Sequence, residues 1–179
     1  IKEGGITFGC SLAGTFDVVS AVRKVTRLPV IPKLTPNVTD VASFARASEE
    51  AGPDAVSLVN TFLGMAIDVE SRRPKLSNIV GGLSGPAIRP IAVRMVYECR
   101  RAVKIPIVGM GGIASATDVL EFLIAGATAV QVGTANFVDP FIWTKLLDGL
   151  RDYLQRHAIA HVTDLTGTMH TTAREKEWV

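Results

Sequence analysis

Short apolar runs alternate along the chain with longer segments whose apolar residues recur at helical spacing. Runs that are apolar almost without interruption are typical of parallel strands, because helices cover their faces. Such runs predict strands over residues 28–34, 55–59, 105–110 and 129–132. The amphipathic spacing predicts helices over residues 16–26, 39–52, 90–103, 115–126 and 139–156, with a short last helix or turn over 162–165. This alternation indicates an α/β fold with a parallel sheet.

The predicted strands form only part of a closed architecture. A sheet of so few strands has two open edges, which favours a part of a barrel over a complete small fold. The prediction is a (β/α)8 TIM barrel of which the C-terminal half to two-thirds is present. An open doubly wound sheet is the alternative, but its first strand–helix turn would lack the GxGxxG motif. Because the chain opens at Ile1 without a methionine, we expect a segment of something longer.

Local signals refine these elements. Pro32 removes a ladder donor from the first strand and implies an edge, a bulge or a distortion there. Residues 1–15 are rich in glycine and are predicted to be a loop. Ser115 offers an N-cap for its helix, and Gly126 ends it. The inward faces of the helices over 16–26, 39–52 and 139–156 are predicted to be Val18, Val19, Val22 and Val25; Val41, Phe44, Ala45 and Ser48; and Trp143, Leu146, Leu147, Leu150 and Leu154.

Glycine follows two successive predicted strands directly. Gly111 and Gly112 come after the strand over 105–110, and Gly133 with Thr134 after the strand over 129–132. Backbone amides with little side chain in the way suit a phosphate, and (β/α)8 barrels commonly hold a phosphate after strands seven and eight. Tight strand–helix turns alone would also explain each glycine. Their recurrence on successive units favours the phosphate.

Polar side chains follow the two earlier strands at the same end of the sheet. Lys33 lies near the carboxyl end of one strand, and Asn60 and Thr61 follow the next. A lysine there can offset a bound anion, and an asparagine can both donate to and accept from a ligand. The alternatives are a lysine whose stem lies on the barrel rim and an asparagine that only forms an Asx-turn. Residues 62–90 form a long connection that suggests a functional loop or small subdomain, in which Gly81, Gly82 and Gly85 allow close approach to a ligand and Ser84 can donate to a phosphate.

Composition adds few constraints. Of the 179 residues, 47% are hydrophobic and 20% charged, and the net charge of +2 argues neither for nor against nucleic acid. We expect no membrane segment, because no run reaches about 18 apolar residues, and no signal-peptide pattern is present. Cys10 and Cys99 form no framework and the three histidines no metal motif, so we expect no metal site and a reducing, cytoplasmic location.

Several longer motifs resemble one enzyme family. The chain resembles the catalytic, FMN-binding subunit of class 1B dihydroorotate dehydrogenases over residues 1–166, which we expect to be a partial barrel domain followed by a polar tail over 167–179. The motifs are KEGG at residues 2–5, PKLTPNVTD at 32–40, SLVNTFLGMAIDVESRRP at 57–74, GGLSGPAIRPIAVRMVY at 81–97, IVGMGGI at 107–113 and AVQVGTANFVDP at 129–140.

The resemblance implies an FMN-dependent oxidation of dihydroorotate to orotate in pyrimidine (UMP) biosynthesis. Electrons would pass to NAD through a partner subunit that carries FAD and a 2Fe-2S cluster, in a homo-oligomer or heterotetramer. Residues implied to contact FMN are Lys33, Val59, Gly85, Gly111, Gly112, Gly133 and Thr134. Those implied to bind the pyrimidine are Asn60 and Thr61.

One departure from the family pattern concerns catalysis. The family's catalytic base is a cysteine in an Asn-x-Ser-Cys-Pro-Asn segment upstream of the motif that begins here at Lys2. Cys10 matches a variable loop position, so no catalytic residue is assigned, and we expect the chain to be inactive alone. The alternatives are the barrel domain of a dihydropyrimidine dehydrogenase, which has similar NTxxG and GLSGPAI patterns, and a non-catalytic phosphate-binding fragment.

Overall fold

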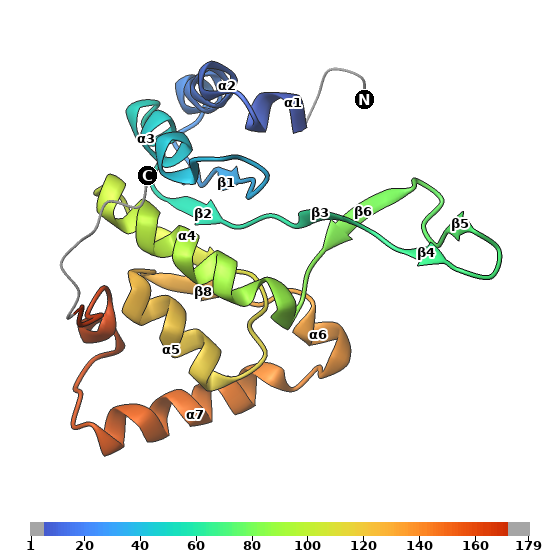
Figure 1. Cartoon of the computed structure of the whole chain (residues 1–179). Coiled ribbons are helices and arrows are strands. Elements are labelled where there is room, and N and C mark those ends of the chain that lie inside the picture. The colour runs from blue at the N-terminus through green and yellow to red at the C-terminus, as the bar shows by residue number, and fades with distance from the viewer. Residues whose placement is uncertain (1–5, 172–179) are drawn as a thin grey trace.

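A parallel sheet lies at the centre of the computed structural model, which describes residues 6–171. The sheet has four strands in the order β1-β2-β7-β8, and every neighbouring pair is parallel. The strands are β1 (Lys33–Leu34), β2 (Val56–Leu58), β7 (Ile107–Met110) and β8 (Ala129–Gln131) (Figure 1). The predicted α/β alternation is therefore confirmed.

Helices lie along the sheet and also pack on one another. They are α1 (Ile6–Gly9), α2 (Leu12–Val25), α3 (Val41–Glu50), the 3-10 helix η1 (Pro86–Ile88), α4 (Arg89–Ala102), α5 (Ala116–Ala125), α6 (Ala135–Val138), α7 (Ile142–Arg156) and the 3-10 helix η2 (Val162–Leu165). Contacts run from α2 to α3, α3 to α4, α4 to α5 and α5 to α7 (Figure 1). This succession matches part of the outer helical ring of a barrel.

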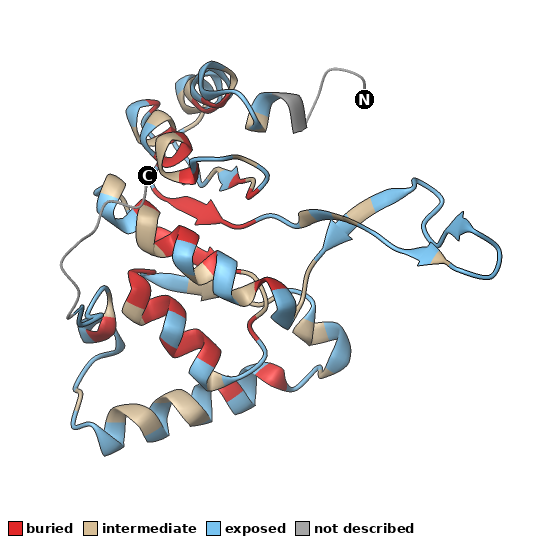
Figure 2. Ribbon diagram, in the orientation of Figure 1, coloured by how far each residue is buried: buried red, intermediate tan, exposed pale blue. Residues whose placement is uncertain are grey.

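The hydrophobic core lies between the sheet and these helices (Figure 2). β2 is buried along its whole length, and the fully buried side chains include Leu58, Ile107 and Phe122. Burial of each such side chain contributes about 1.5–3 kcal/mol. A Cβ atom at Gly109 would lie 2.6 Å from Cδ1 of Phe122, so this glycine lets the aromatic ring rest directly on β7. The inward face predicted for α3 is confirmed by its buried residues, Val41, Phe44, Ala45 and Ser48.

The signals for the ends of α5 are confirmed in detail. The Ser115 side chain accepts from the backbone N–H of Asp118, whose carboxylate accepts from the Ser115 N–H in return. This capping box satisfies donors that a helix N-terminus leaves unpaired. Gly126 ends the helix at φ +126°, a conformation that favours glycine.

Pro32 was predicted to imply an edge, a bulge or a distortion, and the strand that follows it, β1, lies at the edge of the sheet. Only Lys33 and Leu34 form β1, because Pro32 has no N–H to donate. The segment before it still pairs with the next strand through its carbonyl groups. Val30 O accepts from the N–H of Asp54 at 2.9 Å, and Pro32 O accepts from that of Ser57 at 2.9 Å.

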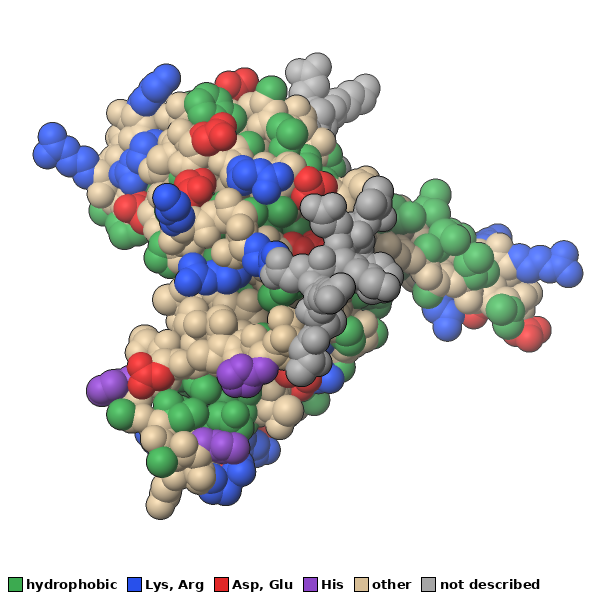
Figure 3. Space-filling view, turned by 60° about the vertical axis from the view of Figure 1, so that its left-hand side comes forward, with side chains coloured by type: hydrophobic (Ala, Val, Ile, Leu, Met, Phe, Trp, Pro, Cys, Tyr) green, Lys and Arg blue, Asp and Glu red, His purple; other side chains and the backbone are tan. Residues whose placement is uncertain are grey.

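The long connection after β2 forms a projecting arm, defined here as residues 62–83 (Figure 1). In it, β3 (Phe62–Met65) pairs antiparallel with β6 (Val80–Leu83), and β4 (Ile67–Asp68) with β5 (Arg73–Pro74). Most of the arm is exposed, and Figure 3 shows apolar side chains along it. Its exposed large apolar residues are Leu63, Met65, Ile67, Val69, Leu76, Ile79, Val80 and Leu83.

The two ends of the chain differ from several predictions. The loop predicted over residues 1–15 was wrong within the described residues, since α1 lies there and Ser11 caps α2. Of the predicted apolar face of α2, only Val19 is buried. The short helix α6 was not predicted, whereas the last helix over 162–165 is confirmed as η2. Residues 1–5, and residues 172–179 of the predicted tail, lie outside the described residues.

The inward face predicted for α7 is only partly confirmed. Leu146 is buried and Leu150 and Leu154 are half-buried, but Trp143 and Leu147 are 41% and 48% exposed. Among the described residues, no helix combines the length and the apolar character needed to cross a membrane.

Removing the Phe122 ring should lower the denaturant concentration at which the protein unfolds. We expect Phe122→Ala to reduce the free energy of unfolding by about 3–5 kcal/mol, because a large cavity would open beside Gly109. Urea unfolding followed by circular dichroism measures this. Thr117→Ala, at an exposed position of the same helix, should change the stability by less than about 0.5 kcal/mol. Equal effects of the two substitutions would contradict the assigned packing.

Candidate functional site

A cavity of ≈ 730 Å³ opens at the carboxyl ends of the parallel strands. Its volume is within the range of about 300–1,000 Å³ usual for small-molecule sites. All the residues that the family resemblance implies for the cofactor and the pyrimidine line it: Lys33, Val59, Asn60, Thr61, Gly85, Gly111, Gly112, Gly133 and Thr134. Parallel strands end at one edge of a sheet, so the topology brings together positions that are far apart in the sequence.

The sheet register places the polar residues of the first two strands side by side. Lys33 lies opposite Ser57, and Leu34 opposite Leu58. Beyond the paired residues, the N–H of Asn60 donates to Leu34 O at 3.0 Å, and the N–H of Val59 donates to Met110 O at 2.9 Å. The backbone from Val59 to Asn60 is therefore fixed from both sides.

Lys33 and Asn60 present free polar groups at the cavity. Both residues are exposed, and neither side chain makes a hydrogen bond or ion pair with another described residue. The Asx-turn considered for Asn60 is therefore not formed. Asn37 stabilises the adjoining turn instead, since its side-chain amide donates to Thr61 O at 3.0 Å and its Oδ1 accepts from the N–H of Leu63 at 3.0 Å.

The Gly111–Gly112 turn requires glycine for reasons of backbone conformation and packing. Gly111 has φ +129° and Gly112 φ +77°. Residues other than glycine rarely adopt such values, because their Cβ atom would be strained. A Cβ atom at Gly112 would lie 2.7 Å from Gly85 O and 2.9 Å from Arg89 Cβ. The tight-turn explanation therefore accounts for these two glycines by itself.

Gly133 and Gly85 border open space instead. A Cβ atom at either position would have no heavy atom within 4 Å. Gly85 has φ +87°, which favours glycine. The φ of Gly133 lies outside the left-handed region, so neither conformation nor packing demands glycine at position 133. Both residues line the cavity, and their bare backbone fits a ligand that approaches the amides closely.

The polar groups between these glycines are partly paired. Ser84 Oγ and Thr134 Oγ1 lie 2.8 Å apart and join the base of the arm to the loop after β8. Ser84 was proposed from the sequence, and it lines the cavity. Gly81 and Gly82, proposed with it, belong to β6 and are not among the lining residues. A Cβ atom at Gly82 would lie 2.4 Å from Thr61 Oγ1, so glycine at this position leaves room for the Thr61 side chain.

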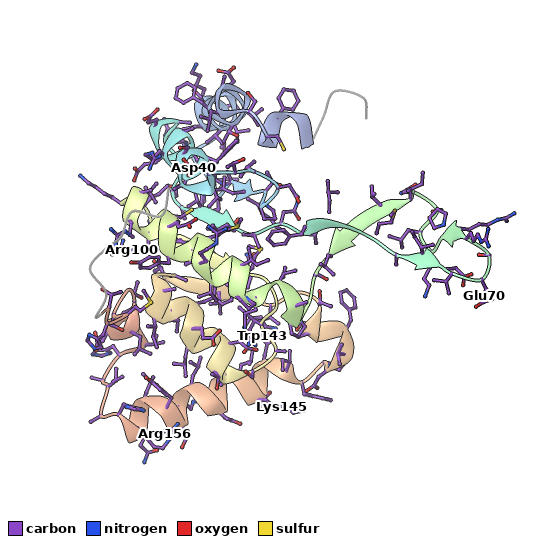
Figure 4. The ribbon with its side chains drawn as sticks, viewed as in Figure 1. Asp40, Glu70, Arg100, Trp143, Lys145 and Arg156 are labelled. Carbon is purple, nitrogen blue, oxygen red and sulfur yellow. The ribbon has the colours of Figure 1, made fainter. Side chains whose placement is uncertain are left out.

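The start of α7 supplies a wall that sequence reasoning missed. Asp139, Ile142, Trp143 and Lys145 line the cavity, and Figure 4 shows Trp143 and Lys145 on that helix. Lys145 Nζ donates to Asp139 Oδ2 at 2.6 Å, which, with the N–H of Phe141, holds the pKa of the Asp139 carboxyl below its ordinary value. Sequence spacing does not identify Asp139 and Lys145 as a pair at a binding site, and the helix over 139–156 was predicted only to pack on the core.

No group of three or more His, Cys, Asp or Glu side chains that could hold a metal is found within residues 6–171. Cys99 is buried on α4, and burial raises the pKa of its thiol to about 12. It therefore stays protonated and acts as an apolar core residue. Cys10 is exposed and is not among the residues lining the cavity.

Comparison with known proteins relates this chain to one family. A family model described as dihydroorotate dehydrogenase matches residues 1–154. The catalytic subunit of dihydroorotate dehydrogenase B (NAD(+)) from Porphyromonas gingivalis is 56% identical over 169 residues, covering 94% of this chain and 55% of that protein. The subunit of the same name from Pelobacter propionicus is 54% identical, with shares of 94% and 56%. The chain thus spans about half the length of the curated relatives it matches.

A solved structure shows the same fold. The crystal structure of DHODH in complex with ferulenol from Eimeria tenella matches with a TM-score of 0.74 at 24% identity, over 88% of this chain and 48% of that one. At this identity the likeness concerns the fold alone. With the parallel sheet and its outer helices, it confirms the predicted partial (β/α)8 barrel.

Alanine substitutions should separate the two kinds of glycine. We expect Gly112→Ala to destabilise the protein by about 1–3 kcal/mol, because it combines a strained φ with a clash. Gly133→Ala should leave the stability within about 0.5 kcal/mol, since its methyl group would enter open space. Thermal unfolding of the two variants beside the parent tests this. A large loss of stability in Gly133→Ala would contradict the open environment described here.

Proposed function

The chain belongs to the dihydroorotate dehydrogenase family, and on that basis we propose that it forms the FMN- and pyrimidine-binding part of such an enzyme. The reaction is the oxidation of dihydroorotate to orotate, a step of pyrimidine (UMP) biosynthesis. One observation carries the proposal. The residues that the family resemblance assigns to FMN and to the pyrimidine all line a single cavity at the carboxyl ends of the strands.

The cavity fits the phosphate end of FMN. Gly85 and Gly133 leave space where any other residue would place a side chain. The backbone amides of Gly111, Gly112, Gly133 and Thr134 are the groups we propose for the phosphate, and Val59 would contact the ring system. When bound, FMN supplies the two-electron acceptor chemistry. The protein supplies a fixed set of amides that need little rearrangement on binding.

Lys33 and Asn60 would act beside the reacting ring. The free ammonium group of Lys33 can offset negative charge that accumulates on the flavin during oxidation of the substrate. The free amide of Asn60 can donate to a carboxylate or a carbonyl and accept from a ring N–H. Thr61 adds a hydroxyl next to it. These groups orient the pyrimidine at the end of the sheet and favour the anionic substrate over a neutral one.

A partner completes the proposed enzyme. The relatives are named as catalytic subunits of an NAD(+)-dependent enzyme, which supports a second subunit that passes electrons onward. We propose that this subunit carries FAD and a 2Fe-2S cluster and that the assembly is a homo-oligomer or a heterotetramer. The cytoplasmic location expected from the sequence is part of the same proposal.

Spectroscopy and turnover test the function. The complete protein, expressed with its partner subunit, should show the visible absorption bands of a bound flavin. It should reduce NAD when given dihydroorotate. Dihydrouracil, which lacks the carboxylate, serves as the control substrate. A protein without flavin would contradict the whole proposal, and a preference for dihydrouracil would favour the dihydropyrimidine dehydrogenase alternative.

Substitution of the two free polar groups tests their assigned roles. We expect Lys33→Ala to lower kcat by about 10²–10³-fold, since it removes a preorganised charge. Asn60→Ala should raise KM for dihydroorotate by about 10–100-fold through the loss of hydrogen bonds to a charged ligand. Steady-state kinetics of the flavin-loaded enzyme measure both. Asn37→Ala, which removes a turn contact near Thr61, controls for loop disturbance, and normal rates in the first two variants would show the roles to be wrong.

A further inference from the structure

A buried carboxylate lies directly behind the Gly111–Gly112 turn. The Asp118 side chain is 5% exposed. Its Oδ2 accepts from the N–H groups of Ala114 and Ser115, each at 2.8 Å. Ala114 also lines the cavity, so this carboxylate fixes the last part of the loop that forms the cavity wall. Because Asp118 accepts from the amides at the end of the loop, the amides earlier in the loop are the ones that remain for a ligand.

Arg89 connects this carboxylate to the second loop of the cavity. Its guanidinium Nη1 donates to Asp118 Oδ1, and Arg89 is the first residue of α4, just after the Gly85 turn and η1. A Cβ atom at Gly112 would lie 3.0 Å from the Arg89 backbone nitrogen. The Gly85 and Gly112 turns are thus packed against each other, and the Arg89–Asp118 ion pair joins them from behind.

The charged side chains Arg89, Glu121 and Asp118 differ in how far water screens them. Arg89 Nε is buried and makes no hydrogen bond, although Glu121 Oε2 lies at an ion-pair distance of 3.2 Å. Glu121 is 44% exposed, so water screens its charge. Asp118 has no such access to water, and a buried carboxylate without its partner is strongly unfavourable. Beside the two amides that donate to Asp118, Arg89 supplies the cationic group that compensates its charge.

We propose that Arg89 and Asp118 are positioning residues for the phosphate of the flavin. Asp118 holds the loop in shape through its two amide contacts. Arg89 neutralises Asp118, so that the dianionic phosphate is not repelled by a buried negative charge behind the amides that bind it. Neither side chain is assigned a contact with the ligand. This inference rests on the proposed function, because it assumes that FMN occupies the cavity.

A comparison of FMN with riboflavin tests the inference, since riboflavin has the same ring system without the phosphate. Dissociation constants are measured by flavin fluorescence on the complete protein after removal of its flavin. Arg89→Gln should weaken FMN binding about tenfold and change riboflavin binding less than about twofold. Adding Asp118→Asn to this variant should restore at least half of the lost affinity on a logarithmic scale, because the uncompensated charge is gone.

Two further variants serve as controls. Arg94→Gln removes another arginine–carboxylate pair of α4, that with Glu98, and should leave both affinities unchanged. Arg89→Lys keeps the charge, so the ratio of FMN to riboflavin affinity should stay near that of the parent even if Arg89→Gln does not fold. A fall of this ratio in Arg89→Lys overturns the charge argument.

The outcomes separate this inference from the proposed function. Parent protein that binds FMN, with Arg89→Gln weakening both flavins equally and no recovery in the double variant, assigns Arg89 a purely structural role and overturns the inference alone. Parent protein that binds neither flavin overturns the proposed function, and the inference with it.

Discussion

The parallel pairing of β2 with its two neighbours is the constraint on which the rest of the structure depends. β2 is buried along its length, and its register with β1 and β7 is set by successive backbone hydrogen bonds. A shift of one residue would turn the core side chains of a strand to the opposite face. Such a shift would also move Asn60 away from Lys33. Core packing and site geometry are therefore fixed by the same hydrogen bonds.

The helices make this register stable and shape the turns at its end. Glycine at position 109 brings the Phe122 ring against β7, which anchors α5 close to the sheet. The N-terminus of α5 then lies just behind the Gly111–Gly112 turn, where the Ser115–Asp118 capping box organises the loop. The capping box that begins α5 thereby also shapes the wall of the cavity. Stability and binding are coupled at this point, because the same amides and carboxylate serve both.

Two kinds of glycine meet at the cavity, and only one kind is explained by folding. Positions 111 and 112 need glycine for their φ values. At position 133 the structure leaves open space, and a glycine there is better explained by a ligand that approaches the backbone.

The projecting arm presents a different case. Its apolar residues are exposed over both hairpins, and they are separate from the polar groups of the cavity.

Apolar periodicity in the sequence determined the four strands of the parallel sheet and most helices, because burial on a sheet or along a helix face leaves a regular pattern. The antiparallel strands β3 to β6 of the arm were not predicted, since this segment was expected only to be a functional loop or small subdomain. It failed for α1 and the start of α2, where glycines suggested a loop and the Ser11 cap was overlooked. It failed in part for α7, where Trp143 and Leu147 remain exposed. Glycines and polar residues at strand ends indicated the candidate site, since parallel strands end at one edge.

Tertiary structure alone decided how those residues meet. The packing of the elements places Asp139 and Lys145 at the cavity, leaves the Asn60 amide free of a local turn, and sets Arg89 against Asp118. These arrangements depend on contacts between residues far apart in the chain, and no local pattern encodes them. Sequence periodicity reports which face of an element is buried, whereas the distances between elements are set by how their side chains pack.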